Sequence, residues 1–205
     1  MRVSDLTPGK VISGGPAPAT GGARERRSAS RPDPADGEES RGFRSDPVRV
    51  AIALGSNIGD RESHLHHAIE RLRALLTDVR VSPFFETEPQ EVAPQPLFLN
   101  AALVGVSPVP PRVLLDTLLA IERERGRERP HPGAPRTLDL DLVLFGALVI
   151  EEPGLVVPHP RFRERRFVLE PLAAIAPEMP DPVTARTVGE LLEEWRMKNA
   201  EGRRG

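Results

Sequence analysis

The sequence predicts an α+β domain in which helices pack on the faces of an antiparallel sheet. Segments rich in β-branched and aromatic residues alternate with segments whose apolar residues recur at helical spacing. Along the chain the order is strand, helix, strand, strand, helix, strand, followed by further elements. This order is that of the ferredoxin-like fold.

The first half of the domain is expected to contain three strands and one helix. Residues 48–57 (VRVAIALGSN) are an apolar, β-branched run that indicates a buried strand with a tight connection to the following helix. Residues 60–77 carry apolar side chains at helical spacing and predict an amphipathic helix. Residues 79–87 predict a strand interrupted at Pro83, and residues 96–106 predict the next strand.

The second half begins with another amphipathic segment. Two prolines at 110–111 predict the start of a helix, and Gly126 predicts its end. Residues 137–145 predict the next strand. A short hairpin strand at 147–151 and a helical segment at 165–176 are expected to follow it.

The two ends of the chain differ in character. Residues 1–46 are rich in Gly, Ala, Pro, Ser and mixed charge, with little apolar surface to offset the roughly 1–2 kcal/mol per residue that ordering a backbone costs. We therefore expect a disordered N-terminal extension, with residues 47–205 forming the folded domain. Near the C-terminus, Thr187 and Glu190 form a capping box that predicts a terminal helix.

Composition excludes several classes of protein. The net charge is −2, with 28 basic and 30 acidic residues, which disfavours a nucleic-acid or anionic-membrane partner. The absence of cysteine excludes disulfides, thiolate nucleophiles and zinc-thiolate sites. No apolar run approaches the roughly 18 residues that span a bilayer, and the N-terminus lacks the pattern of a secretory signal. We expect a cytoplasmic protein and, without a heptad repeat or long exposed edge, a monomer.

Two aspartates lie in the apolar stretch RTLDLDLVLFG, residues 136–146. Because side chains alternate along a strand, Asp139 and Asp141 share one face and the leucines around them share the other. From the spacing alone, a strand with one solvated face is the better explanation. However, Val143 and Phe145 are expected to continue the aspartate face as apolar residues, which favours a cation site at the end of a buried face. Hard carboxylate ligands favour Mg²⁺ over Zn²⁺.

Basic residues flank this stretch on both sides. The loop at 126–136 and the segment at 159–166 supply arginines and histidines, which suit a polyphosphate beside a carboxylate-bound cation, although a solvated loop is the alternative. The sequence contains no P-loop, no dinucleotide-binding fingerprint and no nucleophile elbow. We interpret LGSNIGD, residues 54–60, as a strand-to-helix connection without a direct phosphate role.

Several separated stretches, in the same order and spacing, resemble one family. Together they cover residues 48–182 and are similar to the 6-hydroxymethyl-7,8-dihydropterin pyrophosphokinases of folate biosynthesis. The most specific is PRTLDLDLVLFG, and the others are ALGSN, FFETEP, FLNAALVG and VPHPRFRERRFVLEPLAAIAPE. The resemblance implies a diphosphotransferase that moves the β,γ-diphosphate of ATP, its co-substrate, to the hydroxymethyl group of the pterin and releases AMP.

The resemblance also implies roles for individual residues. Asp139 and Asp141 match aspartates that hold two Mg²⁺ ions and, with Arg127 and Arg136, make up the catalytic set. The pterin site is implied to contain Asn100, Thr87, Gln90, Phe98 and Phe167. The Asn100 amide binds the hydrogen-bonding edge of the ring, and the two phenylalanines sandwich its faces. The nucleotide site is implied for Glu122, Arg127, Arg136, His159 and Arg165.

The sequence departs from the family pattern in two places. The loop before the aspartates lacks the tryptophan of many members and is one residue shorter, so closure is expected to use Arg127, Arg129 and His131. Pro160 replaces an aromatic residue after the histidine. The loops at 87–97 and 126–136 flank the inferred site and are expected to close on binding.

Two other functions remain open from the residues alone. A ferredoxin-like RNA-binding module needs exposed aromatic residues on the sheet and a basic face, which the net charge disfavours. A metal-dependent phosphohydrolase could use the same aspartates, but it gives Asn100 and the two phenylalanines no role.

Overall fold

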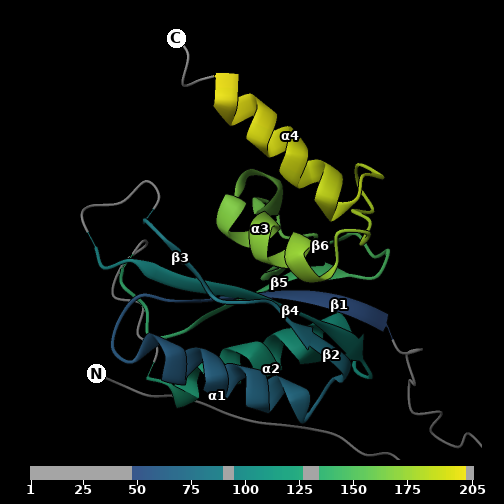
Figure 1. Ribbon diagram of the computed structural model, residues 1–205. Helices are drawn as coiled ribbons and strands as arrows, with labels where there is room; N and C mark the ends of the chain where they lie inside the picture. The colour runs from purple at the N-terminus through teal and green to yellow at the C-terminus, as the bar shows by residue number, and fades with distance from the viewer. Residues whose placement is uncertain (1–47, 90–94, 127–133, 202–205) are drawn as a thin grey trace, which may run out of the picture. The chain divides into compact units, whose positions relative to one another are not determined.

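The computed structural model describes residues 48–89, 95–126 and 134–201. The predicted N-terminal extension at 1–46 lies outside them. The described part forms a five-stranded antiparallel sheet with helices on both faces, which confirms the α+β, ferredoxin-like prediction (Figure 1). Within this part, no helix has the length and apolar character needed to cross a membrane.

The strands and helices follow one another in the predicted order. Their bounds are β1 Val48–Ser56, α1 Arg61–Arg73, β2 Thr77–Val81, β3 Phe85–Thr87, β4 Phe98–Ser107, α2 Pro111–Glu124, β5 Asp139–Phe145, β6 Ile150–Glu152, β7 Leu155–Val157, the 3₁₀ turn η1 Phe162–Glu164, α3 Arg166–Ile175 and α4 Val188–Glu201. The main sheet has the order β2-β4-β1-β5, with β3 paired to β4. Strand β5 therefore lies at an edge.

The core has two parts, one on each face of the sheet. On one face, apolar side chains of β1, β4 and β5 pack against α1 and α2. On the other face the strands present small residues such as Ala51 and Ala102, and these pack against α3, which in turn carries α4. Figure 1 shows α1 and α2 below the sheet, α3 above it and α4 projecting from α3.

Helix α1 ends at Arg73, four residues before the predicted end. The leucines continue the helical spacing, but the amide of Leu76 donates to the carbonyl of Leu72 and the chain then turns into β2. The Leu76 side chain is buried against Gly105, where an added Cβ would lie 3.2 Å from Leu76 Cβ. The leucine is therefore a core residue of the turn and not of the helix.

A β-bulge in β5 overturns the predicted position of Phe145. The pairing of β5 with β1 shifts between Leu142 and Leu144, so one extra residue, Val143, interrupts the alternation. Val143 and Leu144 both belong to the core on the α3 face, whereas Phe145 belongs to the core on the α1 and α2 face. The prediction that Phe145 continues the aspartate face is wrong, because the alternation of side chains breaks at a bulge.

The hairpin after β5 lies later than predicted. A turn at residues 146–149 separates β5 from β6, and β6 pairs with β7. Gly146 has a φ of 54°, and a Cβ there would lie 2.5 Å from Val48 Cγ1, so this turn requires glycine. The apolar residues before Ile150 belong to the turn, and Val149 is exposed.

The predicted capping box is confirmed at the start of α4. The Thr187 amide donates to Glu190 Oε2 at 2.7 Å, and the Glu190 amide donates to Thr187 Oγ1 at 3.3 Å.

Just before the helix, Asp181 is completely buried and accepts two hydrogen bonds of 2.7 Å from the Arg163 guanidinium. This pair ties η1 to the segment that leads into α4.

Replacing Asp181 with asparagine is expected to lower the free energy of unfolding at neutral pH by about 3 kcal/mol and to flatten its dependence on acid pH. Burial opposes ionisation of Asp181, but hydrogen bonds from Arg163, Thr184 and Val183 hold its pKa below the ordinary value of 3.8. Because the folded-state pKa is the lower one, this stabilisation is complete above the unfolded-state pKa and is lost as pH falls through the folded-state pKa. Urea unfolding from neutral pH to about pH 3 measures the effect. An identical pH dependence in both proteins would contradict it.

Candidate active site

Residues from three strands meet on the α3 face of the sheet. In the pairing register, Gly55 on β1 lies opposite Asn100 on β4 and opposite Asp139 on β5. A Cβ placed on Gly55 would lie 3.2 Å from Asn100 Oδ1, 3.9 Å from Phe98 Cδ1 and 4.0 Å from Asp139 Cβ. The residues predicted to bind the pterin and those predicted to bind the metal therefore lie on either side of the same glycine.

The aspartate pair has incompletely compensated negative charge. Burial raises the pKa of Asp141, and Asp139 raises it further, while His159, Arg165 and Arg136 oppose these effects. Arg136 forms an ion pair with Asp139. The raised pKa means that the Asp141 carboxylate gains from additional positive charge at this position.

Two basic residues from the segment before α3 face the same carboxylate. His159 Nε2 lies 3.8 Å from Asp141 Oδ2, and Arg165 Nη1 lies 3.5 Å from the same oxygen. The His159 amide donates to the carbonyl of Val143, so the bulge in β5 anchors this histidine. Burial lowers the pKa of His159, and the neighbouring Arg165 lowers it too, while Asp141 opposes them.

The pterin-side residues lie at the end of β4. Asn100 is buried, and its Nδ2 donates to Thr87 Oγ1 at 2.7 Å. Thr87 pairs with Phe98 across β3 and β4, so these three predicted residues are adjacent. Phe167 comes from α3, which packs on β4, and the Arg165 guanidinium lies 5.5 Å from the centre of its ring. The two phenylalanines thus come from two elements packed against one another.

Glu122 binds the backbone of the strand that carries the two aspartates. It is buried on α2, on the opposite side of the sheet, and its Oε1 accepts a hydrogen bond of 2.7 Å from the amide of Leu140. Leu140 lies between the two aspartates on the edge strand, so Glu122 fixes the backbone that carries them. A contact with the nucleotide stays a prediction.

Some predicted site residues lie outside the described part of the chain. These are Gln90 and Arg127, together with the residues expected to close the shortened loop, Arg129 and His131. Their assigned roles stay predictions.

Asn57 is a site residue that the sequence analysis did not identify. It is almost completely buried. Its side-chain Oδ1 accepts a hydrogen bond of 2.7 Å from the backbone amide of Arg136, and its backbone amide donates to the Arg136 carbonyl. Its Nδ2 donates to Gln95 Oε1 and to the Pro96 carbonyl, and a cavity of 390 Å³ lies beside these contacts. Asn57 therefore clamps the segments that precede β4 and β5. The sequence feature that could have identified Asn57 is its position, an asparagine directly after a buried strand.

The donor set fits a magnesium site. Among the described residues, no group of three or more His, Cys, Asp or Glu side chains comes together to hold a metal. Mg²⁺ is often bound by one or two carboxylates, with water and substrate phosphates as its other ligands. Asp139 and Asp141, two neighbouring carboxylates with basic residues beside them, match that pattern.

A family model described as 7,8-dihydro-6-hydroxymethylpterin-pyrophosphokinase (HPPK) matches residues 51–177. The chain belongs to this family. One relative is the 2-amino-4-hydroxy-6-hydroxymethyldihydropteridine pyrophosphokinase of Bacillus subtilis. It is 44% identical over 151 residues, which are 72% of this chain and 90% of the relative. The Pseudomonas aeruginosa protein of the same name is 41% identical over 146 residues, or 70% of this chain and 90% of that protein.

Longer proteins contain a similar HPPK region. The mitochondrial folate synthesis bifunctional protein of Arabidopsis thaliana is 44% identical over 124 residues, which are 60% of this chain but 22% of that protein. The fold resembles the crystal structure of wild-type Plasmodium falciparum HPPK-DHPS with a TM-score of 0.60 and 15% identity, covering 75% of this chain and 46% of that one. The HPPK resemblance predicted from the sequence is thus confirmed.

Proposed function

We propose that this HPPK-family chain transfers the β,γ-diphosphate of ATP to the hydroxymethyl group of 6-hydroxymethyl-7,8-dihydropterin and releases AMP, as a step of folate biosynthesis. The observation that supports this most is the position of Gly55 between Asn100 and Asp139. A flat heterocycle bound at Asn100 is next to a polyphosphate bound at the aspartates. The relatives named above carry the name of this activity.

On the nucleotide side, Arg136, His159 and Arg165 bind the triphosphate, and Asp139 and Asp141 hold two Mg²⁺ ions. Guanidinium groups suit phosphate oxygens because they donate paired hydrogen bonds. When bound, Mg²⁺ neutralises charge on the phosphate oxygens and lowers the pKa of a coordinated hydroxyl. Arg127 completes this side of the proposed site, and Glu122 supports it from the opposite face of the sheet through the Leu140 amide.

On the pterin side, Phe98 and Phe167 stack on the two ring faces while the Asn100 amide binds the polar edge. The Asn100 Nδ2 bond to Thr87 fixes the orientation of the amide, which selects one hydrogen-bonding pattern. Gln90 contributes from the loop before β4. Stacking supplies contact area, and the amide supplies selectivity.

In the proposed reaction, the pterin hydroxyl oxygen attacks the β-phosphorus in line with the bond to the α,β-bridging oxygen. A new oxygen–phosphorus bond forms as that bond breaks, AMP leaves with the bridging oxygen, and the hydroxyl proton passes to solvent. The residues of the chain act by holding the two substrates in line and by neutralising negative charge. No described residue is assigned as a general base.

The nucleotide product tests this function. Purified protein is incubated with ATP, Mg²⁺ and the reduced hydroxymethyl pterin, and the nucleotides are separated by chromatography. We expect AMP to form only when the pterin is present, and none with the 6-methyl pterin that lacks the hydroxyl. Formation of ADP or inorganic phosphate in place of AMP would contradict the proposal and favour a phosphohydrolase.

Replacing Gly55 with alanine is expected to weaken pterin binding about tenfold while leaving ATP binding within about twofold. The new methyl group would lie 3.2 Å from Asn100 Oδ1, so the buried amide must shift by a few tenths of an ångström. A shift of a hydrogen-bonding group changes selectivity for a bound heterocycle by about 1–2 kcal/mol. Calorimetric titration of each substrate measures the two affinities. Equal loss for both substrates would contradict this position for the pterin.

A further inference from the structure

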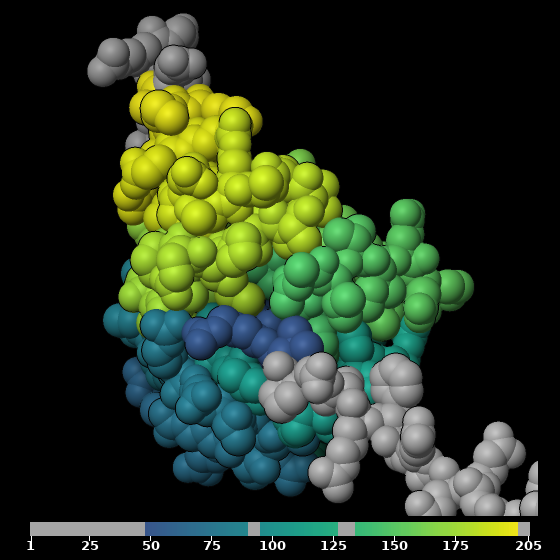
Figure 2. All heavy atoms as spheres, turned by 90° about the vertical axis from the view of Figure 1, so that its right-hand side faces the viewer, coloured from purple at the N-terminus to yellow at the C-terminus, as the bar shows by residue number. Residues whose placement is uncertain are grey.

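The C-terminal helix lies beyond the residues that match the family model, which end at 177. Helix α4 packs against α3 and η1. Figure 2 shows this helix, in yellow, stacked over α3 on the side away from the sheet. The helix is thus remote from the strands that carry Asp139 and Asp141, but it contacts the segment that carries Arg165.

Arg165 connects the parts of the proposed site. Its Nη1 lies 3.5 Å from both Asp141 Oδ2 and His159 Nε2, and its guanidinium lies over the ring of Phe167. The residue itself is in extended backbone between η1 and α3, with φ −101° and ψ 99°. The position of its side chain therefore depends on how the two flanking elements are held.

Contacts on both sides of Arg165 lead to the C-terminal segment. Arg163 donates two hydrogen bonds to the buried Asp181. The carbonyl of Glu164 accepts a hydrogen bond of 3.0 Å from Trp195 Nε1 on α4. The Arg166 guanidinium lies 5.8 Å from the centre of the Trp195 ring. Residues directly before and after Arg165 thus contact the same tryptophan.

We infer that Trp195 is a positioning residue for the active site, and that α4 holds the Arg165 guanidinium against Asp141. Because this role presupposes the diphosphate transfer proposed above, it deepens that function. A charged group that stabilises a transition state acts only when it is held within a fraction of an ångström of its working position. A long arginine side chain on extended backbone needs such support.

The composition supplies a direct probe of this contact. Trp195 is the only tryptophan of the chain, which contains no tyrosine. Intrinsic tryptophan fluorescence therefore reports on α4 alone. At analogue concentrations that saturate each protein in calorimetric titration, binding of a non-hydrolysable ATP analogue with Mg²⁺ is expected to change this fluorescence in the wild-type protein and to leave it unchanged when Arg165 is replaced by alanine. A signal that persists in R165A would overturn the link.

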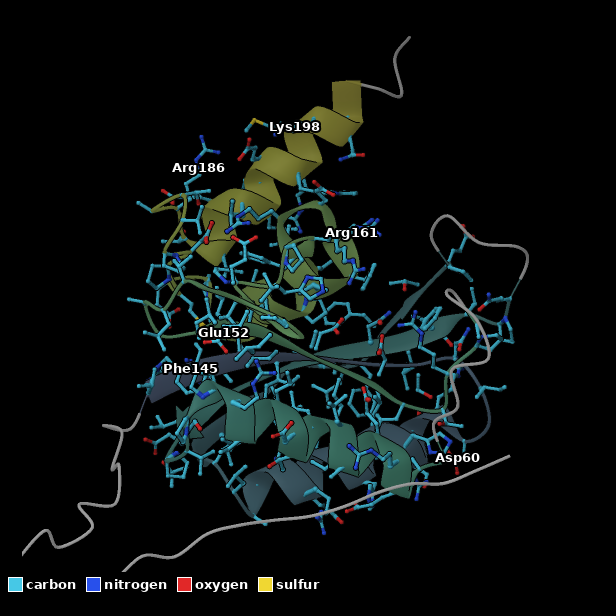
Figure 3. The ribbon with its side chains drawn as sticks, turned by 180° about the vertical axis from the view of Figure 1, so that it is seen from behind. Asp60, Phe145, Glu152, Arg161, Arg186 and Lys198 are labelled. Atoms are coloured by element: carbon cyan, nitrogen blue, oxygen red, sulfur yellow. The ribbon has the colours of Figure 1, made fainter. Side chains whose placement is uncertain are left out.

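The kinetic test uses Trp195→Phe, which keeps an aromatic ring beside Arg166 but removes the N–H donor. We expect kcat/KM for MgATP to fall about fivefold, the loss typical of one hydrogen bond, with KM for the pterin unchanged. The matched control is Lys198→Ala on the outer part of the same helix, where the lysine binds Glu194 (Figure 3). The control is expected to keep wild-type kinetics.

A double-mutant cycle separates positioning from general destabilisation. If Trp195 acts through Arg165, Trp195→Phe has less than about a twofold effect in the R165A background. Losses that multiply independently would show that the tryptophan acts elsewhere and would overturn the inference. Wild-type protein that makes no AMP would contradict the proposed function instead, because the fluorescence titration with the analogue does not depend on turnover.

Discussion

Replacing Asp141 with asparagine is expected to lower kcat for AMP formation by about a thousandfold, since metal-ion charge stabilisation contributes several kcal/mol to such reactions. The substitution keeps the size of the side chain but removes the charge proposed to hold Mg²⁺. Burial and the neighbouring Asp139 raise the pKa of the Asp141 carboxylate, so the ionised group destabilises the folded chain in the absence of a cation.

The same substitution therefore has a second expected effect, on stability. Because the folded-state pKa of Asp141 is raised, its ionised carboxylate lowers the free energy of unfolding at pH values above that pKa. Asparagine removes this destabilisation, so in the absence of Mg²⁺ Asp141→Asn is expected to unfold at the same temperature as wild type or at a higher one. Thermal unfolding and AMP formation are measured on the same preparations. The exposed Glu151→Gln on β6 serves as the control for loss of one carboxylate. Near-wild-type turnover in Asp141→Asn would contradict the metal site.

Replacing Asn100 with alanine is expected to lower kcat/KM for the pterin roughly a hundredfold, equivalent to about 2–3 kcal/mol, while affinity for ATP stays within about threefold. The side chain is buried and its Nδ2 is bonded to Thr87, so its loss removes both the proposed ring contact and the group that orders Thr87. Sites built to hydrogen-bond a substrate discriminate strongly when one partner is missing.

The affinities for each substrate decide this prediction. Titration of the pterin and of an ATP analogue with Asn100→Ala is compared with Thr117→Ala, a polar residue of α2 whose hydroxyl donates to the Val113 carbonyl of the same helix. The control is expected to bind both ligands as wild type does. Weakened nucleotide binding in Asn100→Ala, with unchanged pterin binding, would place the heterocycle elsewhere on the sheet.

Local patterns in the sequence predicted much of the fold. Element order, the interruption at Pro83 and the capping box at Thr187 depend on neighbouring residues, and all three agree with the structure. The shared face of Asp139 and Asp141 follows from strand alternation. The position of Phe145 could not be predicted in this way. The bulge at Val143 arises from the pairing of β5 with β1 and is not visible in the residue pattern of β5 itself.

The supporting residues of the site were harder to predict, because their partners are distant in sequence. Asn57 contacts Arg136 across 79 positions, and Trp195 contacts Glu164 across 31. Such hydrogen bonds depend on how the loops are brought together by the sheet and by α3. Glu122 was assigned to the nucleotide from the family resemblance, and its bond to the Leu140 backbone became visible only in the fold.

The most direct measurement follows the phosphorus atoms. ATP that is radiolabelled at its β-phosphorus is incubated with the protein, Mg²⁺ and the reduced hydroxymethyl pterin, and the products are separated. The proposed reaction moves the two terminal phosphates as one unit, so all transferred label is expected in the pterin product, with unlabelled AMP formed in equal amount. Label found in ADP, or in inorganic diphosphate without a labelled pterin, would contradict diphosphate transfer at the site formed by Asn100, Asp139 and Asp141.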